Sequence, residues 1–188
     1  MDENSELILA DFDERSKKSL EHFQGVLAGI RTGRASPALI EKVRVEAYGT
    51  PTPLNQLAHI SVPEARQLMV KPFDGSILKD VEKALYAADI GMTPSTDGKV
   101  IRLTLPPLSG EQRQKLVAKV KELAEEARVA LRNERRDANK HAEQEFKDNN
   151  LTEDHLQELK DRIQEALKAA EKQIDEMVAK KSDEVLND

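Results

Sequence analysis

The chain has 188 residues, enough for one or two domains with a hydrophobic core. Its net charge is −6, 34% of its residues are charged and only 3% are aromatic, so the core must be built from aliphatic side chains. Cys is absent, which excludes a disulfide framework, a thiolate nucleophile and a Cys-based zinc site.

The first residues and the hydropathy bear on localisation. Residues 1–6 are acidic, unlike the basic start of a secretory signal or an Arg-rich transit peptide. No apolar run approaches the roughly 18 residues that a membrane span needs. We therefore expect a cytoplasmic protein that makes no membrane contact.

The first expected element is a long amphipathic helix over about residues 7–31. Its apolar side chains recur at spacings of three and four, which places them on one stripe: Leu20, Phe23, Leu27 and Ile30. Gly33 and Pro37 end the helical pattern.

Residues 38–105 have a different pattern, which predicts a small α+β unit. Val43, Val45 and Ala47 alternate with polar residues, as in a strand, and residues 49–53 are expected to be a turn or extended linker. Residues 57–62, 67–72 and 99–105 are the other expected strands, with a hairpin signal at Asp97-Gly98 and a short helix over 77–89. Val81, Leu85 and Ala88 are expected to face inward from that helix.

Two further long helices follow. Ser109, with Gln112 three residues on, predicts a capping box that starts a helix running to about residue 147. Its apolar seam is expected at Leu116, Val120, Leu123, Ala127 and Ala130. Thr152 caps a third helix with a sustained heptad pattern from Leu156 to Met177. Three such helices pack favourably as an antiparallel bundle.

Charge is unevenly distributed along the last two helices. Residues 113–140 hold 9 basic and 5 acidic residues, whereas residues 147–188 hold 7 basic and 12 acidic ones. Arginine forks suit phosphate oxygens, so the basic helix is a candidate RNA-binding face formed by Arg113, Arg128, Arg132, Arg135, Arg136 and Asn139. The alternative is a solvated face whose arginines pair with Glu125, Glu134 and Asp137.

The sequence carries few signs of a catalytic or metal-binding site. The four His residues are scattered over different elements, and no HExxH, P-loop or G-x-S-x-G pattern occurs. We therefore expect no enzymatic activity, no catalytic residue, no metal site and no cofactor.

Helix-breaking residues mark both crossings between the helical part and residues 34–107. We expect a discontinuous bundle domain made of residues 1–33 and 108–188, with an inserted domain at 34–107. The hinge segments are then 31–37 and 105–108, since hinges are a few positions at element ends. The candidate hinge residues are Arg31, Gly33, Arg34, Pro37, Pro106 and Pro107.

Several segments together resemble the bacterial ribosome recycling factor family, in its order and spacing. They are Ile30–Pro37, Val45–Leu54, Gln56–Ala58, Ala88–Gly91, Ile101–Arg102, Leu105–Leu108 and Ala127–Asn139. The resemblance implies a three-helix bundle with an inserted β/α/β sandwich, in an L-shaped outline like that of tRNA. One departure is the stretch 110–114, where the family often has consecutive basic residues and this chain has only Arg113.

The resemblance also implies a function and partners. The family acts on the post-termination ribosome with elongation factor G, which hydrolyses GTP, and splits it into subunits so that mRNA and tRNA are released. The basic helix would then bind large-subunit rRNA at the intersubunit face, and the chain would be a monomer in solution. The alternative is a helical adaptor that binds protein partners through the inserted domain.

Overall fold

The structure, a computed structural model, describes residues 2–188, which divide into two compact units. The first unit contains the residues up to Leu27 together with Ala118–Ser182, and the second contains Ala28–Val117 together with Asp183–Asp188. Long helices dominate the first unit and a small β-sheet dominates the second, which confirms the expected α+β class with a helical bundle.

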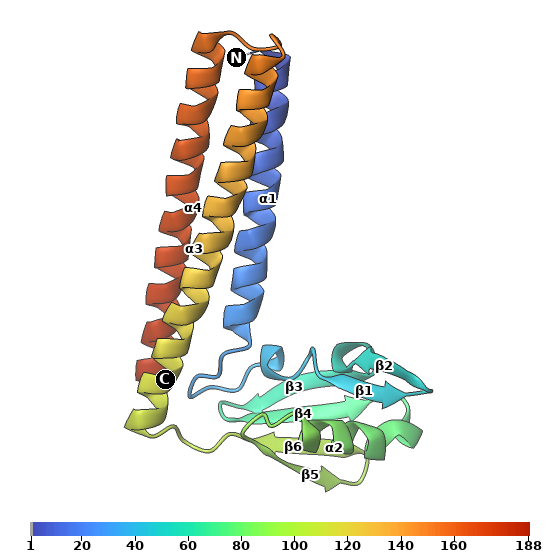
Figure 1. Ribbon diagram of the computed structural model, residues 1–188. Coiled ribbons are helices and arrows are strands. Elements are labelled where there is room, and N and C mark those ends of the chain that lie inside the picture. The colour runs from blue at the N-terminus through green and yellow to red at the C-terminus, as the bar shows by residue number, and fades with distance from the viewer. Residues whose placement is uncertain (1) are drawn as a thin grey trace. The chain divides into compact units, whose positions relative to one another are not determined.

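The bundle is built from three long helices, α1 (Glu3–Ala28), α3 (Gly110–Lys147) and α4 (Glu153–Asn187) (Figure 1). The chain reverses between α3 and α4, so α3 runs antiparallel to both of its neighbours. Helix α1 begins four residues earlier than expected because the carboxylate of Asp2 accepts a hydrogen bond from the Ser5 N–H at 2.8 Å.

The expected caps of the other two helices are present. The Ser109 N–H donates to the Gln112 side chain at 2.9 Å and the Gln112 N–H donates to the Ser109 hydroxyl at 3.2 Å, which is the predicted capping box. The Thr152 hydroxyl accepts from the His155 N–H at 3.2 Å. Both signals in the sequence therefore mark true helix starts.

The bundle core is aliphatic, but its line on α3 differs from the predicted seam. Among the five predicted residues, Val120 is fully buried, and Leu116, Leu123, Ala127 and Ala130 are half-buried. The innermost line also includes Val117, Ala124, Leu131, Ala138 and Ala142. A helix with two neighbours buries a face wider than one seam, and periodicity alone does not show which row points to the bundle axis.

The second unit contains a hairpin and a four-stranded antiparallel sheet. The hairpin pairs β1 (Arg44–Ala47) with β2 (Thr50–Pro53). The sheet has the order β3-β4-β6-β5 and is formed by β3 (Ala58–Glu64), β4 (Gln67–Pro72), β5 (Thr93–Asp97) and β6 (Val100–Thr104). Short 3-10 turns lie at Pro37–Leu39, Leu54–Gln56 and Gly75–Ile77.

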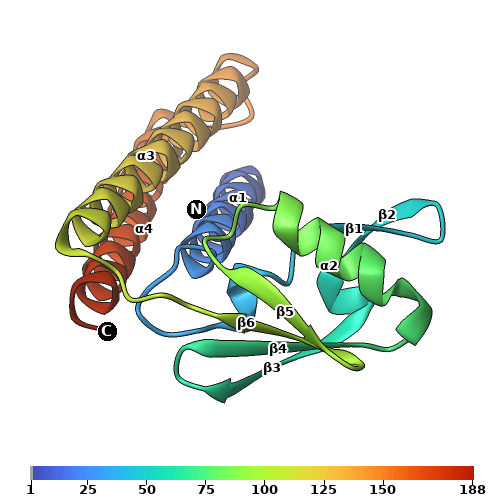
Figure 2. The same ribbon diagram turned by 90° about the horizontal axis from the view of Figure 1, so that it is seen from below.

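Helix α2 (Leu78–Ala87) packs on one face of the sheet, and both meet the hairpin in one core (Figure 2). That core is closed by fully buried side chains such as Val45, Leu54, Leu68, Val81, Leu85, Ile101 and Leu103. The predicted strands and hairpin at Asp97-Gly98 are confirmed, whereas Ala88 is exposed rather than inward-facing.

The stretch 49–53 was expected to be a turn or extended linker, and it is the turn and strand β2 of a hairpin. Two prolines within it, Pro51 and Pro53, lie opposite Glu46 and Arg44 in the register. A two-stranded hairpin leaves one edge of each strand unpaired, so it tolerates prolines that a central strand would not.

Candidate nucleic-acid interface

Most residues of the candidate face lie on α3 within the first unit. The spacing of four, three and four from Arg128 through Arg132 and Arg135 to Asn139 keeps them on one flank of the continuous helix. The helix is 38 residues long, or about 57 Å at 1.5 Å per residue. A long, straight helix of this kind presents its side chains along a ridge rather than in a pocket.

Acidic residues hold the first two arginines of this flank. Arg128 donates to Asp175 on α4 at 2.6 Å and to Glu125 at 3.3 Å. Arg132 donates to Glu171 on α4 at 3.1 Å and to Glu125 at 3.5 Å. The hydrogen bond to Asp175 raises the pKa of Arg128 above its ordinary value. The guanidinium groups are thus fixed by carboxylates, mainly from the neighbouring helix.

Two of the acidic partners expected from the sequence are engaged elsewhere. Glu134 accepts a hydrogen bond from the Ser19 hydroxyl of α1 at 2.5 Å, and Asp137 accepts from Arg15 of α1 at 3.1 Å. Only Glu125 pairs with the arginines as expected. Glu171 and Asp175 were missed by sequence reasoning, although the acidic excess of residues 147–188 is the signal that could have pointed to them.

The other end of the flank has no carboxylate partner. Arg135 donates to the uncharged Gln164 side chain at 3.1 Å. Arg136 is exposed, and neither arginine lies within 4.0 Å of a carboxylate in the part of the chain that the structure describes. Asn139 is half-buried with its side-chain oxygen turned inward, so it offers little surface to a ligand.

Arg113 lies in the second unit, and its guanidinium binds main-chain carbonyl groups and not carboxylates. Its guanidinium donates to the main-chain oxygens of Val185 at 2.5 Å and Asp188 at 3.2 Å, at the end of α4. These bonds satisfy carbonyl groups that a helix C-terminus leaves free. Arg113 therefore caps a helix in this structure, whereas Arg128 and Arg132 face carboxylates.

The candidate hinge residues all belong to the second unit, and several hold its connections together. The Arg31 guanidinium donates to the Pro106 carbonyl at 2.5 Å, which ties the two crossings to each other. Burial, with Arg113 nearby, lowers the pKa of Arg31. Pro37 begins a 3-10 turn capped by Ser36, and Pro107 is exposed beside Pro106.

Gly33 makes a close approach that only glycine permits. A Cβ added at this position would lie 2.0 Å from the main-chain oxygen of Asp188. Arg34, next in sequence, lies 4.0 Å from the Asp188 carboxylate. The first crossing is thus packed directly against the end of α4.

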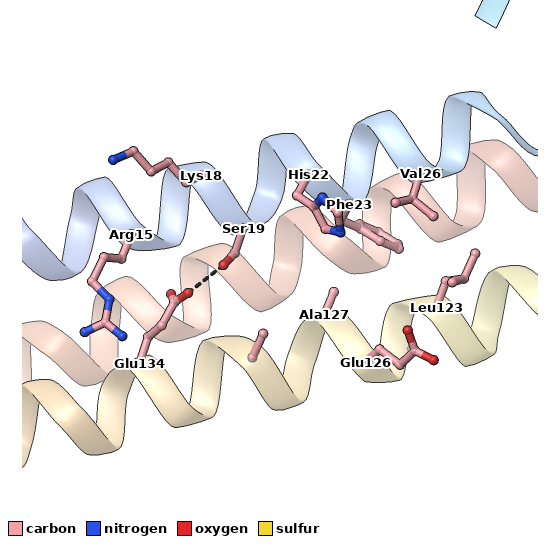
Figure 3. Close-up of a pocket in the computed structure, with 11 residues that line it drawn as sticks. Arg15, Lys18, Ser19, His22, Phe23, Val26, Leu123, Glu126, Ala127 and Glu134 are labelled. Atoms are coloured by element: carbon pink, nitrogen blue, oxygen red, sulfur yellow. Dashed lines mark hydrogen bonds between the residues drawn. The ribbon is translucent and has the colours of Figure 1, made fainter. Parts of the chain in front are cut away.

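A hollow of about 460 Å³ lies between α1 and α3 in the first unit (Figure 3). Its apolar lining includes Phe23, Val26 and Leu123, and the Ser19–Glu134 hydrogen bond crosses one end. His22 is the only histidine among its lining residues.

Among residues 2–188, no group of three or more His, Asp or Glu side chains is arranged to hold a metal ion. Within the same residues, no helix has the length and apolar character that a membrane crossing demands.

Comparison with known proteins identifies the family to which the chain belongs. The family model described as ribosome recycling factor matches residues 23–186. The chain belongs to the ribosome recycling factor family. Its function is accordingly ribosome recycling, as the resemblance of its motifs had indicated.

Curated relatives support this assignment over nearly the whole chain. A ribosome-recycling factor of Desulfosudis oleivorans is 46% identical over 181 residues, covering 96% of this chain and 98% of that protein. One from Rhodopirellula baltica is 54% identical over 138 residues, covering 73% of this chain and 74% of that protein.

Solved structures of the family share the fold. A solution structure of a ribosome recycling factor matches with a TM-score of 0.77 and 34% identity, with 100% of both chains covered. The T. thermophilus factor, described with E. coli elongation factor G bound to the E. coli post-termination complex, matches with a TM-score of 0.66 and 38% identity. That match covers 97% of this chain and 99% of the other.

Proposed function

We propose that this chain recycles the post-termination ribosome together with elongation factor G, and that it acts mechanically rather than as an enzyme. The partner factor hydrolyses GTP, and its movement drives the ribosome apart into subunits so that mRNA and tRNA leave. Family membership supports this proposal, as does the similar T. thermophilus factor described with elongation factor G on a post-termination complex.

The observation that carries the proposal is the arginine flank of α3, which is formed by Arg128, Arg132, Arg135 and Arg136. Arg135 and Arg136 face no carboxylate within 4.0 Å among the described residues, so their charge is available to a phosphate. Arg128 and Arg132 are only partly exposed, at 23% and 46% of their side chains, but their carboxylate partners are exchangeable surface groups. We infer that all four bind phosphates of large-subunit rRNA at the intersubunit face.

The roles of the other two candidates are narrower. Arg113 donates to the carbonyls at the end of α4, so we assign it a structural contribution beside any rRNA contact. Asn139 has its side-chain oxygen buried, so we place it at the margin of the rRNA face.

The hinge segments would let the bundle and the inserted domain change their relative orientation while the factor works. We propose that residues 31–37 and 105–108 are these segments, separating a bundle domain (1–33 and 108–188) from an inserted domain (34–107). The Arg31–Pro106 bond, which joins the two crossings, would couple their movement. Such a factor acts in the cytoplasm, where ribosomes are, and a monomer suffices.

The experiment is splitting of purified post-termination ribosomes, followed by light scattering, with and without elongation factor G and GTP. We expect splitting only when this chain, the factor and GTP are all present. Arg132→Ala/Arg135→Ala should weaken ribosome binding by roughly tenfold or more, because each arginine contributes a charge-assisted phosphate contact.

The matched control removes an arginine of similar exposure from another helix. Arg162→Ala deletes a half-exposed guanidinium of α4 that pairs with Glu158 at 3.3 Å. It should leave splitting unchanged. Normal binding and splitting by the double variant would overturn the rRNA face, and salt-insensitive binding to a protein would favour the adaptor alternative.

A further inference from the structure

The carboxylates opposite the arginine flank follow a regular pattern across the two helices. Arg128 faces Asp175 and Arg132 faces Glu171, so each step of four residues along α3 matches a step of four back along α4. Successive pairs one helical turn apart form a ladder between antiparallel helices. The pattern belongs to the interface between helices and not to α3 alone.

The ladder ends where the residue of α4 that faces the next arginine is no longer acidic. One turn beyond Arg132, the partner on α4 is the amide Gln164, which accepts from Arg135. Farther along, the polarity reverses, because Lys160 of α4 donates to Glu143 of α3 at 2.6 Å. The flank therefore has two arginines with carboxylate partners followed by two, Arg135 and Arg136, without them.

The pairs are a weak source of stability. Asp175 is 65% exposed and its partner Arg128 23%, while Arg132 is 46% exposed and its partner Glu171 28%, so solvent reaches one member of each pair and partly screens the interaction. Exposed pairs typically contribute a few tenths to about 1 kcal/mol. A stabilising role alone thus explains little of why two carboxylates converge on the arginines of a surface that binds phosphate.

Carboxylate and phosphate oxygens compete for the same guanidinium donors. Both accept charge-assisted hydrogen bonds from the arginine fork, and both carry negative charge. An RNA strand that approaches the flank must therefore displace Asp175 and Glu171 before it can use Arg128 and Arg132. An RNA that engages only the open end gains two phosphate contacts.

We propose that Glu171 and Asp175, with Glu125 shared between the pairs, act as internal phosphate mimics that set the RNA specificity of this face. Non-cognate RNA meets two open arginines and is held weakly. Cognate rRNA is held in register by contacts elsewhere. It supplies enough phosphates to displace the carboxylates and bind all four arginines. The inference rests on the proposed rRNA-binding function of the flank.

The test variant is Glu171→Gln/Asp175→Asn, which keeps side-chain shape and removes two negative charges. The control is Glu165→Gln/Glu176→Gln, which makes the same change in net charge at two exposed α4 carboxylates that have no ion pair among the described residues. Each protein is titrated against a single-stranded poly(U) RNA and against ribosomes over a salt series. Thermal unfolding is measured in parallel.

We expect the test variant to bind poly(U) roughly tenfold more tightly than the wild type at low salt. The slope of log affinity against log salt should steepen by about 1.4, from two additional phosphate contacts on a single strand. Ribosome affinity should rise less, so that the ratio of ribosome to poly(U) affinity falls. The control should change poly(U) binding by less and leave the slope unchanged.

Two results would overturn the inference. One is a test variant that tracks the control in both affinity and slope, which would mean that net charge alone matters. The other is an unchanged ratio of affinities accompanied by a loss of thermal stability, which would make the pairs purely structural. Wild-type splitting is assayed in the same series. Its failure would refute the proposed function, whereas normal splitting with an unchanged ratio would refute only this inference.

Discussion

The two units of this chain use charge in opposite ways. Residues 34–107, which make up most of the second unit, hold 9 basic and 8 acidic residues and are nearly neutral, and a continuous core joins their sheet, helix and hairpin. In the bundle, the basic residues of α3 and the acidic residues of α4 meet across the helix interface. The second unit (residues 28–117 and 183–188, the β unit below) is thus specified by what it buries, whereas the proposed rRNA-binding surface of the bundle is specified by what two helices place side by side.

The units also differ in backbone strain. In the β unit, Tyr48 and Gly49 both have positive φ, at 53° and 77°, at the turn between β1 and β2. Tyr48 is 71% exposed, and its hydroxyl donates to Asp74. The positive-φ residue Asn149, by contrast, lies in the α3–α4 loop and is a type that adopts this conformation readily.

The largest expected effect comes from a large-to-small substitution in the core of each unit. Leu131→Ala in the bundle and Leu103→Ala in the β unit remove fully buried side chains, so each should lower the free energy of unfolding by about 3 kcal/mol. Denaturant titration measures the loss, and amide hydrogen exchange locates it. If each variant loses protection mainly in its own unit, the units are energetically separate, and equal loss across both would contradict that division.

A helix cap tests the bundle on a smaller scale. Thr152→Ala removes the hydroxyl that accepts from the His155 N–H at 3.2 Å, so it should destabilise the bundle by about 1 kcal/mol. Thr152→Ser keeps the acceptor and serves as the control. Equal stability of the Ala and Ser variants in denaturant titration would show that the cap contributes nothing.

A substitution at the strained turn between β1 and β2 is expected to raise, and not lower, the stability of the β unit. Tyr48→Asn places a residue that tolerates positive φ before Gly49, where an Asn-Gly pair suits this turn. We expect stability to rise by about 0.5 kcal/mol, even though the hydrogen bond to Asp74 is lost. Tyr48→Phe, which loses only the hydroxyl, separates the two effects, and a less stable Asn variant would show that the ring or its bond outweighs the strain.

The smallest effect concerns pH at the start of α1. The hydrogen bond from the Ser5 N–H, followed by weaker contributions that include His155, lowers the pKa of Asp2 below its ordinary value of 3.8. A lowered folded-state pKa stabilises the protein above pH 3.8, and this contribution is lost as the pH falls through the folded-state value. Asp2→Ala should therefore be less stable than the wild type at neutral pH, with the difference shrinking in acid. A difference that stays constant down to pH 2 would contradict this linkage.

Local signals in the sequence proved sufficient for many elements. The capping box at Ser109, the hairpin at Asp97-Gly98 and the alternation around Val45 depend on neighbours a few residues away, so they could be predicted. Strand β2 was missed because Pro51 and Pro53 oppose strand formation except at an unpaired edge, and edge position is decided by the rest of the fold.

The candidate site could be predicted only in part. The spacing of Arg128, Arg132 and Arg135 along one helix places them on a common flank whatever surrounds it. Their partners could not be assigned, because Glu134 and Asp137 are near them in sequence yet bind Ser19 and Arg15 of α1. Arg113 carries the same charge but caps the end of α4, which no spacing along α3 could reveal.

By itself, the sequence determined three long amphipathic helices, an inserted α+β segment, a basic helix before an acidic one, and the motifs that mark the family. These properties depend on local spacing and composition, which are the same whatever fold the chain adopts. Only the tertiary structure decided which row of α3 faces the bundle axis, which carboxylates hold Arg128 and Arg132, and which arginines stay open. The reason is that a charge pair between residues 39 or 47 positions apart exists only once helix packing has fixed the register between the two surfaces.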